Sequence, residues 1–204
     1  ACSNENRRNL QRLKIDGIDS TGIHYFLRPL AIGELVLTQT ERQLGCALVD
    51  FGAETTTVSI YKDGALCFLS TLPLGSRLIT RDLMSGLNLT EERAEAFKTG
   101  QGNAVAPESE AADATSREIN AYVQARAGEI AANIINQIVL SGYKTSDLPE
   151  GIVLVGGGAR LRNFAALLAA QGKIQVRAGA MPPTVQFRSA VERSQENIDI
   201  VAIL

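Results

Sequence analysis

Three short apolar runs joined by tight turns form the clearest pattern in the chain. Residues 46–50 are a continuous apolar run that ends in Asp50, which is typical of a strand buried on both faces. Residues 57–61 alternate apolar and polar side chains like a partly exposed strand, and residues 66–71 form a third run. Asp63-Gly64 lies between the second and third runs and favours a two-residue hairpin turn. The pattern therefore predicts three antiparallel strands.

Farther along the chain, apolar positions repeat at the period of a helix. Helices are expected over residues 78–87, 91–98, about 115–140, and 163–170. The apolar stripe of the long helix consists of Ile119, Val123, Ile130, Ile134 and Ile138. Residues 100–114, rich in Gly, Ala, Glu and Pro, are expected to form a surface loop. Residues 151–155 predict a second buried strand and residues 174–177 a last one, so the whole order indicates an α/β layered domain.

The two ends of the chain carry weaker patterns. They predict a polar helix over residues 3–13, a strand over 23–27, a short apolar helix over 30–37 and an apolar tail over 198–204. No apolar run approaches the roughly 18 residues needed to span a bilayer. The first residues include neither an initiating Met nor the apolar core of a signal peptide, so we expect that something upstream has been removed.

Composition narrows the function classes. The chain has 204 residues, of which 45% are hydrophobic and 21% charged, and this balance is typical of a soluble globular protein. A net charge of -2 argues against a nucleic-acid partner, which would favour a basic surface. Cys2, Cys46 and Cys67 are widely spaced, and the single histidine, His24, is expected to be a packed residue. This set argues against a zinc site or a disulfide framework and favours a reducing, cytosolic compartment.

Two glycine-bearing turns carry the candidate chemistry, each directly after a predicted buried strand. In the first, Gly52, Ala53 and Thr55 leave backbone N–H groups open to an anion, and Asp50 can orient water or hydrated magnesium beside a phosphate. Taken alone, this turn is more typical of an ordinary hairpin connection. The second turn consists of Gly156, Gly157, Gly158 and Ala159. It matches neither the Walker A nor the GxGxxG pattern, and a tight strand-to-helix connection remains the alternative.

The order of these features is more specific than either turn. A hairpin with Asp-x-Gly, an insertion, a long helix and an apolar strand with Gly-Gly-Gly-Ala resemble the second half of the actin, sugar-kinase and seventy-kilodalton chaperone superfamily. There the first turn is the phosphate 2 loop and the second the adenosine loop. Glu95 and Lys98 match the Glu-x-x-Lys of the superfamily's adenosine-clasping helix, and their spacing puts them on one helix face. A surface ion pair is the alternative for these two residues.

Within the superfamily, the chain resembles the bacterial cell-division FtsA family. Residues 27–50 look like that family's "EPLAS…VLT-DE-ELGV-VVD" stretch. Further matches lie at residues 64–66, 71–75, 79–82 and 100–104, so the resemblance covers nearly the whole chain. It implies an α/β fold: domain II of an actin-like, ribonuclease H-like ATPase, with a mixed sheet, flanking helices and a small inserted α/β subdomain.

The resemblance also implies a domain division and a site. Residues 1–40 would be a remnant of the first actin-like domain with its connecting helix, residues 41–75 and 126–204 subdomain 2A, and residues 76–125 the inserted subdomain 2B. ATP would be held with magnesium, which is bound through the phosphates and water rather than directly by the protein. The implied nucleotide-binding residues are Asp50, Gly52, Ala53, Thr55, Glu95, Lys98, Gly156, Gly157, Gly158 and Ala159. The phosphate 1 loop of the first domain does not precede Leu27, so the nucleotide site is expected to be half-built.

Two positions depart from the superfamily's D-x-G-G-G-T-x-D pattern. Glu54 replaces a glycine, and Thr57 replaces the second acid. A carboxylate at position 54 would repel a γ-phosphate unless it points away or meets magnesium. Asp50 is then the remaining catalytic candidate, and nucleotide binding is predicted in preference to efficient ATP hydrolysis.

The family resemblance implies an ATP-binding, filament-forming adaptor that tethers FtsZ to the membrane at the septum. The C-terminal tail of FtsZ would bind subdomain 2B, where Gln101 and Asn103 are candidate contacts, and other divisome proteins would be further partners. The protein would be cytoplasmic, at the inner face of the cell membrane, and would reach it only through segments absent from this chain. Two alternatives stay open: a pilus-assembly ATPase of the same fold, and an actin-fold sugar or acetate kinase. No cluster of acids or histidines suitable as a base for a substrate hydroxyl follows Asp50, which argues against the kinase.

Overall fold

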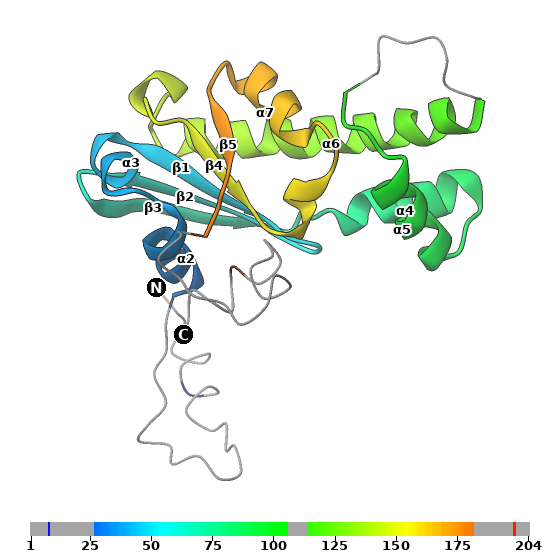
Figure 1. Cartoon of the computed structure of the whole chain (residues 1–204), viewed down its shortest axis with the longest axis horizontal. Helices are drawn as coiled ribbons and strands as arrows, with labels where there is room; N and C mark the ends of the chain where they lie inside the picture. The colour runs from blue at the N-terminus through cyan, green and yellow to red at the C-terminus, as the bar shows by residue number, and fades with distance from the viewer. Residues whose placement is uncertain (1–7, 9–26, 106–113, 182–197, 199–204) are drawn as a thin grey trace.

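A five-stranded mixed sheet forms the centre of the molecule (Figure 1). The structure is a computed structural model, and it describes Arg8, residues 27–105 and 114–181, and Ile198. The strand order is β3-β2-β1-β4-β5. The strands are β1 (Cys46–Phe51), β2 (Thr56–Lys62), β3 (Ala65–Leu72), β4 (Ile152–Val155) and β5 (Val176–Ala178). The predicted antiparallel meander is confirmed in β1, β2 and β3. Asp63 and Gly64 both have positive φ, at 52° and 76°, as a two-residue hairpin turn of the favoured hand requires.

Strand β4 lies parallel to β1, although the two are far apart in the sequence. Ala47 is opposite Ile152, and Asp50 is opposite Val155. Because both strands run in the same direction and in this register, the turns that follow them leave the sheet at the same edge. The two glycine-bearing turns predicted from the sequence are thereby brought side by side.

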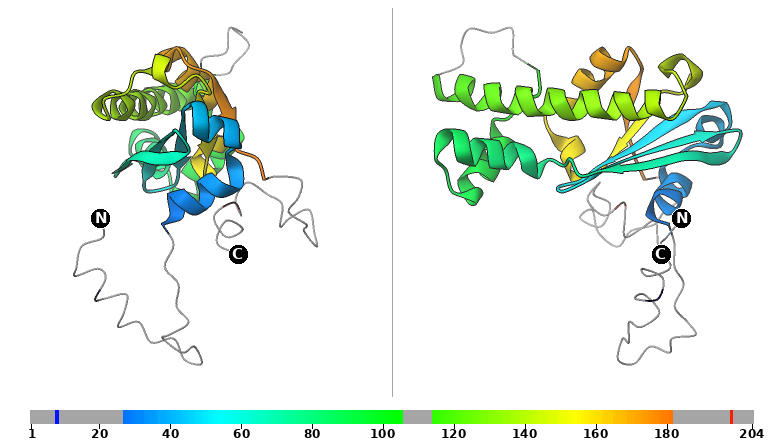
Figure 2. Two further views of the ribbon diagram at one scale, coloured as in Figure 1. Left: turned by 90° about the vertical axis from the view of Figure 1, so that its left-hand side faces the viewer. Right: turned by 180° about the vertical axis from the view of Figure 1, so that it is seen from behind.

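Helices cover both faces of the sheet (Figures 1 and 2). They are α2 (Arg28–Val36), α3 (Gln39–Leu44), α4 (Arg77–Leu87), α5 (Glu91–Gly100), α6 (Ala114–Leu140) and α7 (Phe164–Gly172), with short 3-10 helices η2 (Thr145–Asp147) and η3 (Gly157–Arg160). Alternate residues of β1 explain the two layers. Val49 and Phe51 join the core under α6 and α7, whereas Cys46 and Leu48 join a second core under α2.

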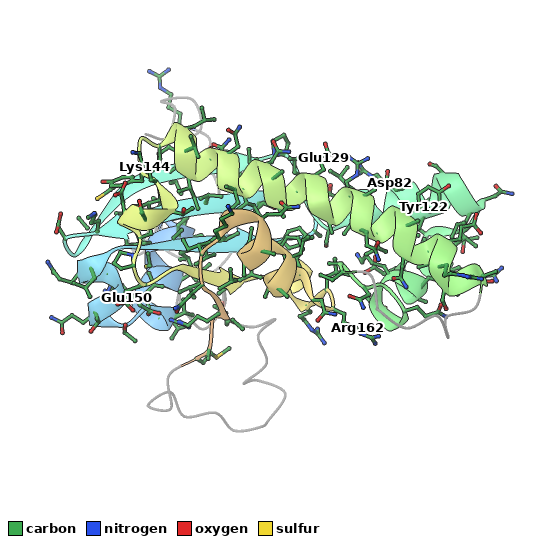
Figure 3. All side chains as sticks on the ribbon, turned by 90° about the horizontal axis from the view of Figure 1, so that it is seen from above. Asp82, Tyr122, Glu129, Lys144, Glu150 and Arg162 are labelled. Atoms are coloured by element: carbon green, nitrogen blue, oxygen red, sulfur yellow. The ribbon has the colours of Figure 1, made fainter. Side chains whose placement is uncertain are left out.

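Helix α6 spans both the sheet and the neighbouring pair of helices, α4 and α5. The predicted stripe of isoleucines and Val123 is fully buried, which confirms the periodicity. The first half of α6 runs beside α4 and α5, which extend past the edge of the sheet, and its second half lies over the strands (Figure 2). Seen from above, Asp82 and Tyr122 lie near one end of this helix and Lys144 beyond the other (Figure 3). Arg126 of α6 binds both carboxylate oxygens of Asp82 on α4, at 2.6 and 3.0 Å.

Three expectations need correction, and one helix was not predicted. Strand β2 is not partly exposed: it is buried almost throughout, because helices cover both faces of this part of the sheet. The expected surface loop starts later, since Gly102, Asn103 and Ala104 are buried beside the start of α7. Helix α3, set by a reciprocal capping box between Thr38 and Glu41, was not expected. Strand β5 covers residues 176–178 rather than 174–177.

The terminal segments stay predictions. The helix over residues 3–13, the strand over 23–27 and the tail over 198–204 lie almost wholly outside the described residues. In the described part of the proposed insertion, residues 76–105 and 114–125, the regular elements are helices joined by turns, and one isolated bridge pairs Asn103 with Arg162. Among the described residues, no helix combines the length and apolar character that crossing a membrane needs.

Candidate functional site

A cavity of about 410 Å³ lies where the two turns meet helices α4 and α5. Its wall comes from four places in the sequence: the turn after β1, the start of α4, the second half of α5, and η3. The lining residues are Ala53, Ser76, Ile79, Glu95, Lys98, Thr99, Gly157, Gly158, Arg160 and Leu161. The polar and backbone groups among them are those that a nucleotide-sized ligand with phosphates and hydroxyls would use.

The first turn is fixed by the start of α4. Gly52 N–H donates to the Thr55 carbonyl at 2.9 Å, which closes the turn. The backbone N–H groups of Ser76 and Arg77 donate to the carbonyls of Gly52 and Ala53, each at 2.9 Å. This packing leaves no room for a side chain at Gly75, where a Cβ would lie 2.1 Å from the Ala53 carbonyl oxygen. The turn is therefore fixed against the N-terminal end of α4.

The second turn passes directly against β1. Gly156 has φ 92° and ψ 164°, and a Cβ there would lie 2.4 Å from the Phe51 carbonyl oxygen and 2.7 Å from Asp50 Oδ1. Only glycine fits both this conformation and this approach. A Cβ at Gly158 would meet the Phe51 ring at 2.8 Å, whereas nothing lies within 4 Å of one at Gly157. Gly157 and Gly158 both line the cavity, and a side chain has room only at Gly157.

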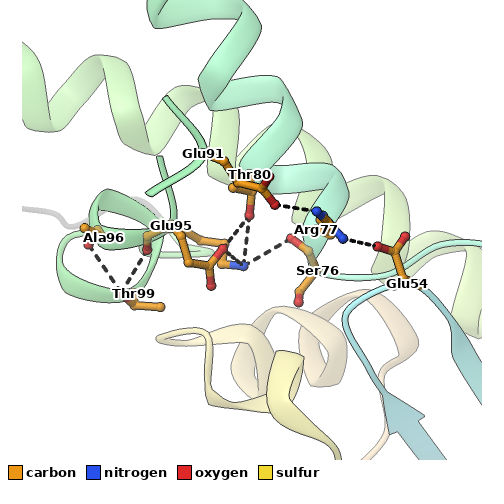
Figure 4. A network of polar contacts seen from close by, with 9 residues as sticks. Glu54, Ser76, Arg77, Thr80, Glu91, Glu95, Ala96 and Thr99 are labelled. Atoms are coloured by element: carbon orange, nitrogen blue, oxygen red, sulfur yellow. Dashed lines mark hydrogen bonds and ion pairs between the residues drawn. The ribbon is translucent and has the colours of Figure 1, made fainter. Parts of the chain in front are cut away.

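Glu95 and Lys98 are not an ordinary surface ion pair, because the Lys98 side chain is only 10% exposed. Its Nζ lies 2.7 Å from Glu95 Oε2 and donates to Thr80 Oγ1 at 3.0 Å and to the Ser76 carbonyl at 3.4 Å (Figure 4). Burial by itself raises the pKa of Glu95, but the hydrogen bonds from Lys98 and Thr80 and the charge of Lys98 outweigh it and lower the pKa. Glu95 is therefore held as a carboxylate beside Lys98 at the cavity wall.

Glu54, the departure from the superfamily pattern, is bound to arginines of α4. Its Oε1 accepts from Arg77 Nη1 at 2.9 Å, and its Oε2 lies 3.8 Å from Arg81 Nη2. Arg77 also binds Glu91 of α5 at 2.6 Å, so it joins the first turn to both helices (Figure 4). The carboxylate that would repel a phosphate is thus paired with two guanidinium groups outside the cavity wall.

Asp50 lies at the end of β1 with its side chain 11% exposed, and Arg28 Nη2 of α2 is 2.8 Å from its Oδ2. Thr57, in place of the second acid, is hydrogen-bonded to Thr71 at 3.1 Å between the two Oγ1 atoms. No group of three or more His, Cys, Asp or Glu side chains with metal-site geometry occurs among the described residues. Hydrated magnesium is usually held by one or two carboxylates together with phosphates, and the carboxylates near this turn are already paired with arginines. The predicted magnesium, held through phosphates and water rather than by direct ligands, therefore stays a prediction.

The predicted site residues divide into two groups. Ala53, Glu95, Lys98, Gly157 and Gly158 line the cavity. Asp50, Gly52, Thr55, Gly156 and Ala159 stand in the same two turns without lining it. Sequence reasoning missed five lining residues: Ser76, Ile79, Thr99, Arg160 and Leu161. Three of them could have been found from their neighbours in the sequence. Ser76 follows Gly75, Thr99 follows Lys98, and Arg160 ends the glycine-rich turn.

The two candidate partner contacts differ in their surroundings. Gln101 is exposed and accepts a long hydrogen bond, 3.4 Å, from Ser116. Asn103 is buried, and its Oδ1 accepts from the Val105 N–H at 3.1 Å and from Asn163 Nδ2 at 2.9 Å. Asn103 therefore holds the insertion against the start of α7, and its role as a partner contact stays a prediction.

Comparisons with known proteins give a consistent picture. The family model described as cell division protein FtsA matches residues 47–194. The chain is 36% identical to the cell division protein FtsA of Porphyromonas gingivalis, with 74% of this chain and 34% of that protein covered. It is 32% identical to FtsA of Neisseria meningitidis (76% and 41% covered) and 34% to FtsA of Bacillus subtilis (71% and 35%). The chain thus spans less than half the length of these curated relatives.

Solved structures agree on the fold. MreB5 of Spiroplasma citri bound to ADP has a TM-score of 0.72 at 15% identity, and covers 98% of this chain and 64% of its own. The PilM-PilN type IV pilus biogenesis complex gives 0.67 at 18% identity, with 88% and 51% covered. The ethanolamine utilization protein EutJ of Carboxydothermus hydrogenoformans gives 0.59 at 20% identity, with 85% and 53% covered. These likenesses confirm the expected actin-like fold.

Proposed function

This chain belongs to the cell division protein FtsA family, and on that premise we propose that it is the nucleotide-binding half of an actin-like cell-division protein. The observation that carries the proposal is the single cavity wall formed by both glycine-bearing turns and by α5. Ala53 and Gly157, more than a hundred residues apart, meet there through the parallel pairing of β1 and β4.

The two turns and the Glu95–Lys98 pair would contact different parts of a bound nucleotide. The backbone of Gly52, Ala53 and Thr55 would hold the phosphates, and Gly156, Gly157, Gly158 and Ala159 would lie under the adenosine, clasped by Glu95 and Lys98. A charged pair already locked by Thr80 loses little conformational entropy when a sugar hydroxyl binds to it. Nucleotide binding remains the proposal rather than hydrolysis, because Thr57 offers no carboxylate to assist Asp50.

Titration with a fluorescent ATP analogue tests this assignment. Replacing Lys98 with Met removes a charge at the cavity wall, and a charge-assisted hydrogen bond contributes about 1.5–3 kcal/mol, so affinity should fall at least about tenfold. Lys144→Met, an exposed lysine beyond α6, is the matched control and should bind like the parent chain. Equal affinities for the two variants would contradict the proposed site.

We further propose that the domain division follows the family. Residues 1–40 would belong to the first domain, 41–75 and 126–204 to subdomain 2A, and 76–125 to subdomain 2B. In the whole protein, subdomain 2B would bind the C-terminal tail of FtsZ, protomers would assemble into filaments, and other divisome proteins would be partners. The protein would then act in the cytoplasm at the inner face of the membrane, at the septum.

Calorimetric titration with an FtsZ tail peptide tests the partner. The insertion is joined to the rest of the chain by the Arg126–Asp82 ion pair and by Asn103, so it should be folded in this chain. Saturable binding that is weakened by Arg93→Glu on the exposed face of α5, or by Gln101→Ala, would support the division adaptor. Absence of binding by a folded sample would favour the alternative of a pilus-type relative, whose fold is also close. Phosphoryl transfer to a small acceptor would instead favour the kinase.

A further inference from the structure

The ammonium group of Lys98 uses its hydrogen-bond donors within the protein. A lysine carries three N–H donors and no acceptor. One is directed at Glu95 Oε2, 2.7 Å away, and the others are donated to Thr80 Oγ1 at 3.0 Å and to the Ser76 carbonyl at 3.4 Å (Figure 4). Because the Lys98 side chain is only 10% exposed, these contacts hold it in one position. Lys98 therefore acts on a bound ligand through its charge and through Glu95.

Glu95 keeps one carboxylate oxygen for a ligand. Its Oε2 lies beside Lys98 and accepts from Thr80 Oγ1 at 2.7 Å. Among the described residues, its Oε1 has no hydrogen-bond or ion-pair partner, the side chain is 49% exposed, and Glu95 lines the cavity. An ionised carboxylate oxygen only accepts hydrogen bonds, so Oε1 favours a ligand group that donates one, such as a sugar hydroxyl.

Thr80 holds the Glu95 carboxylate in this orientation. It is 1% exposed on α4, and its hydroxyl accepts from Lys98 and donates to Glu95, so it lies between the two charged groups. Thr80 follows Ser76 by about one helical turn, and the Ser76 N–H is bound to the Gly52 carbonyl of the first turn. A β-branched side chain has few χ1 rotamers, so the packing of α4 fixes where this hydroxyl lies.

We propose that Thr80 is a positioning residue for sugar recognition: by holding Glu95 Oε2 it aims Oε1 at a ribose hydroxyl, so that the cavity binds ribonucleotides in preference to nucleotides without sugar hydroxyls. This rests on the nucleotide binding proposed above. Without the Thr80 hydroxyl, the half-exposed Glu95 side chain would lose rotamer freedom each time a ligand binds. Thr80 therefore contributes to the affinity of ligands that carry these hydroxyls.

Calorimetric titration with ATP and with 2′,3′-dideoxy-ATP tests the proposal, because the two ligands differ only in the sugar hydroxyls. The parent chain should bind ATP at least about tenfold more tightly, as expected for a hydrogen bond to a charged acceptor. Thr80→Val keeps the shape of the side chain and removes its hydroxyl. In this variant the two affinities should lie within about threefold of each other, because ATP binds more weakly while dideoxy-ATP binds as it does to the parent chain.

Two further variants separate positioning from stability. Thr80→Ser keeps the hydroxyl and should keep the preference for ATP. Thr56→Val is the matched control, because Thr56 is an equally buried threonine whose hydroxyl donates to the Leu74 carbonyl and not to the Glu95–Lys98 pair. It should lose stability and keep the preference. Circular dichroism verifies that each variant is folded, and Thr80→Ala replaces Thr80→Val if the valine variant is not.

Three results would overturn the proposal, each in its own way. Equal binding of ATP and dideoxy-ATP by the parent chain would show that Glu95 does not recognise the sugar, and nucleotide binding itself would stand. An unchanged preference in Thr80→Val, with a melting temperature lowered as in Thr56→Val, would show that Thr80 is only structural. Absence of binding of both ligands by the folded parent chain would overturn the proposed nucleotide function and this inference with it.

Discussion

Replacing Gly156 with alanine should destabilise the chain without touching the cavity. Its φ of 92° with ψ of 164° lies in a region that is essentially reserved for glycine, and a side chain there costs about 1–3 kcal/mol. The new Cβ would also lie 2.4 Å from the Phe51 carbonyl oxygen and 2.8 Å from its carbonyl carbon, both backbone atoms of a buried strand. Overpacking of this kind adds about 1–3 kcal/mol. Together they predict a loss of about 2–6 kcal/mol, or a lowering of Tm by roughly 4–24 °C for a chain of this size.

Gly157→Ala provides the contrast within the same turn. A Cβ at Gly157 meets nothing within 4 Å, so its free energy of unfolding should stay within about 0.5 kcal/mol of the parent chain, while the added methyl group narrows the cavity and weakens nucleotide binding. Urea denaturation followed by far-ultraviolet circular dichroism measures both variants. The reasoning would be refuted if Gly156→Ala were as stable as the parent chain, or if Gly157→Ala lost as much stability as Gly156→Ala.

Three further outcomes follow from other contacts. Arg77→Met should release the Glu54 carboxylate toward the cavity, and nucleotide affinity should fall several-fold while the melting temperature changes little; a change in stability alone would contradict this. Burial by itself raises the pKa of Glu41, but hydrogen bonds from its arginine and threonine partners outweigh it and lower the pKa below the usual 4.5. A lowered folded-state pKa stabilises the protein above pH 4.5, and this contribution is lost as the pH falls further, so the Tm difference between the parent chain and Glu41→Gln should be full at pH 6 and shrink below pH 4.5. A difference that is constant from pH 6 to 3 would exclude this role. Asn103→Ala should lower the free energy of unfolding by about 1–3 kcal/mol, because it removes two side-chain hydrogen bonds that contribute about 0.5–1.5 kcal/mol each. Gln101→Ala should change it by less than about 0.5 kcal/mol, and equal losses in denaturant melts would argue that Asn103 is not structural.

Local patterns were enough to predict most elements of this fold. The Asp63-Gly64 pair fixed the β2–β3 hairpin, and the buried stripe of α6 was legible from its spacing. The burial of β2 could not be predicted from its own sequence. The two layers that cover it come from distant segments, and the alternation of side chains within the strand does not reveal them. Helix α3 is only six residues long and depends on the capping box of Thr38 and Glu41, so it offered no periodicity to recognise.

The candidate site shows the same division. The glycine turns and the Glu95–Lys98 pair could be named from motifs. The arginines could not, because the sequence does not reveal that Arg77 and Arg81 would meet Glu54, or that Arg28 would meet Asp50, until α4 and α2 are packed. Charge compensation of this kind depends on how distant segments pack together. It determines whether the departures from the superfamily pattern at positions 54 and 57 are compatible with a bound phosphate.

The parallel pairing of β1 with β4 also affects the order in which the chain can fold. Ala47 and Ile152 are about a hundred residues apart, so closing that loop carries an entropic cost that must be met before the pairing contributes any stability. The β1–β3 meander consists of local contacts and can form early, with one side of β1 still unpaired. During synthesis, the two halves of the cavity wall cannot meet until β4 has left the ribosome. Chains released before that point would present an open strand edge, prone to pairing with other chains, and no ligand could rescue them.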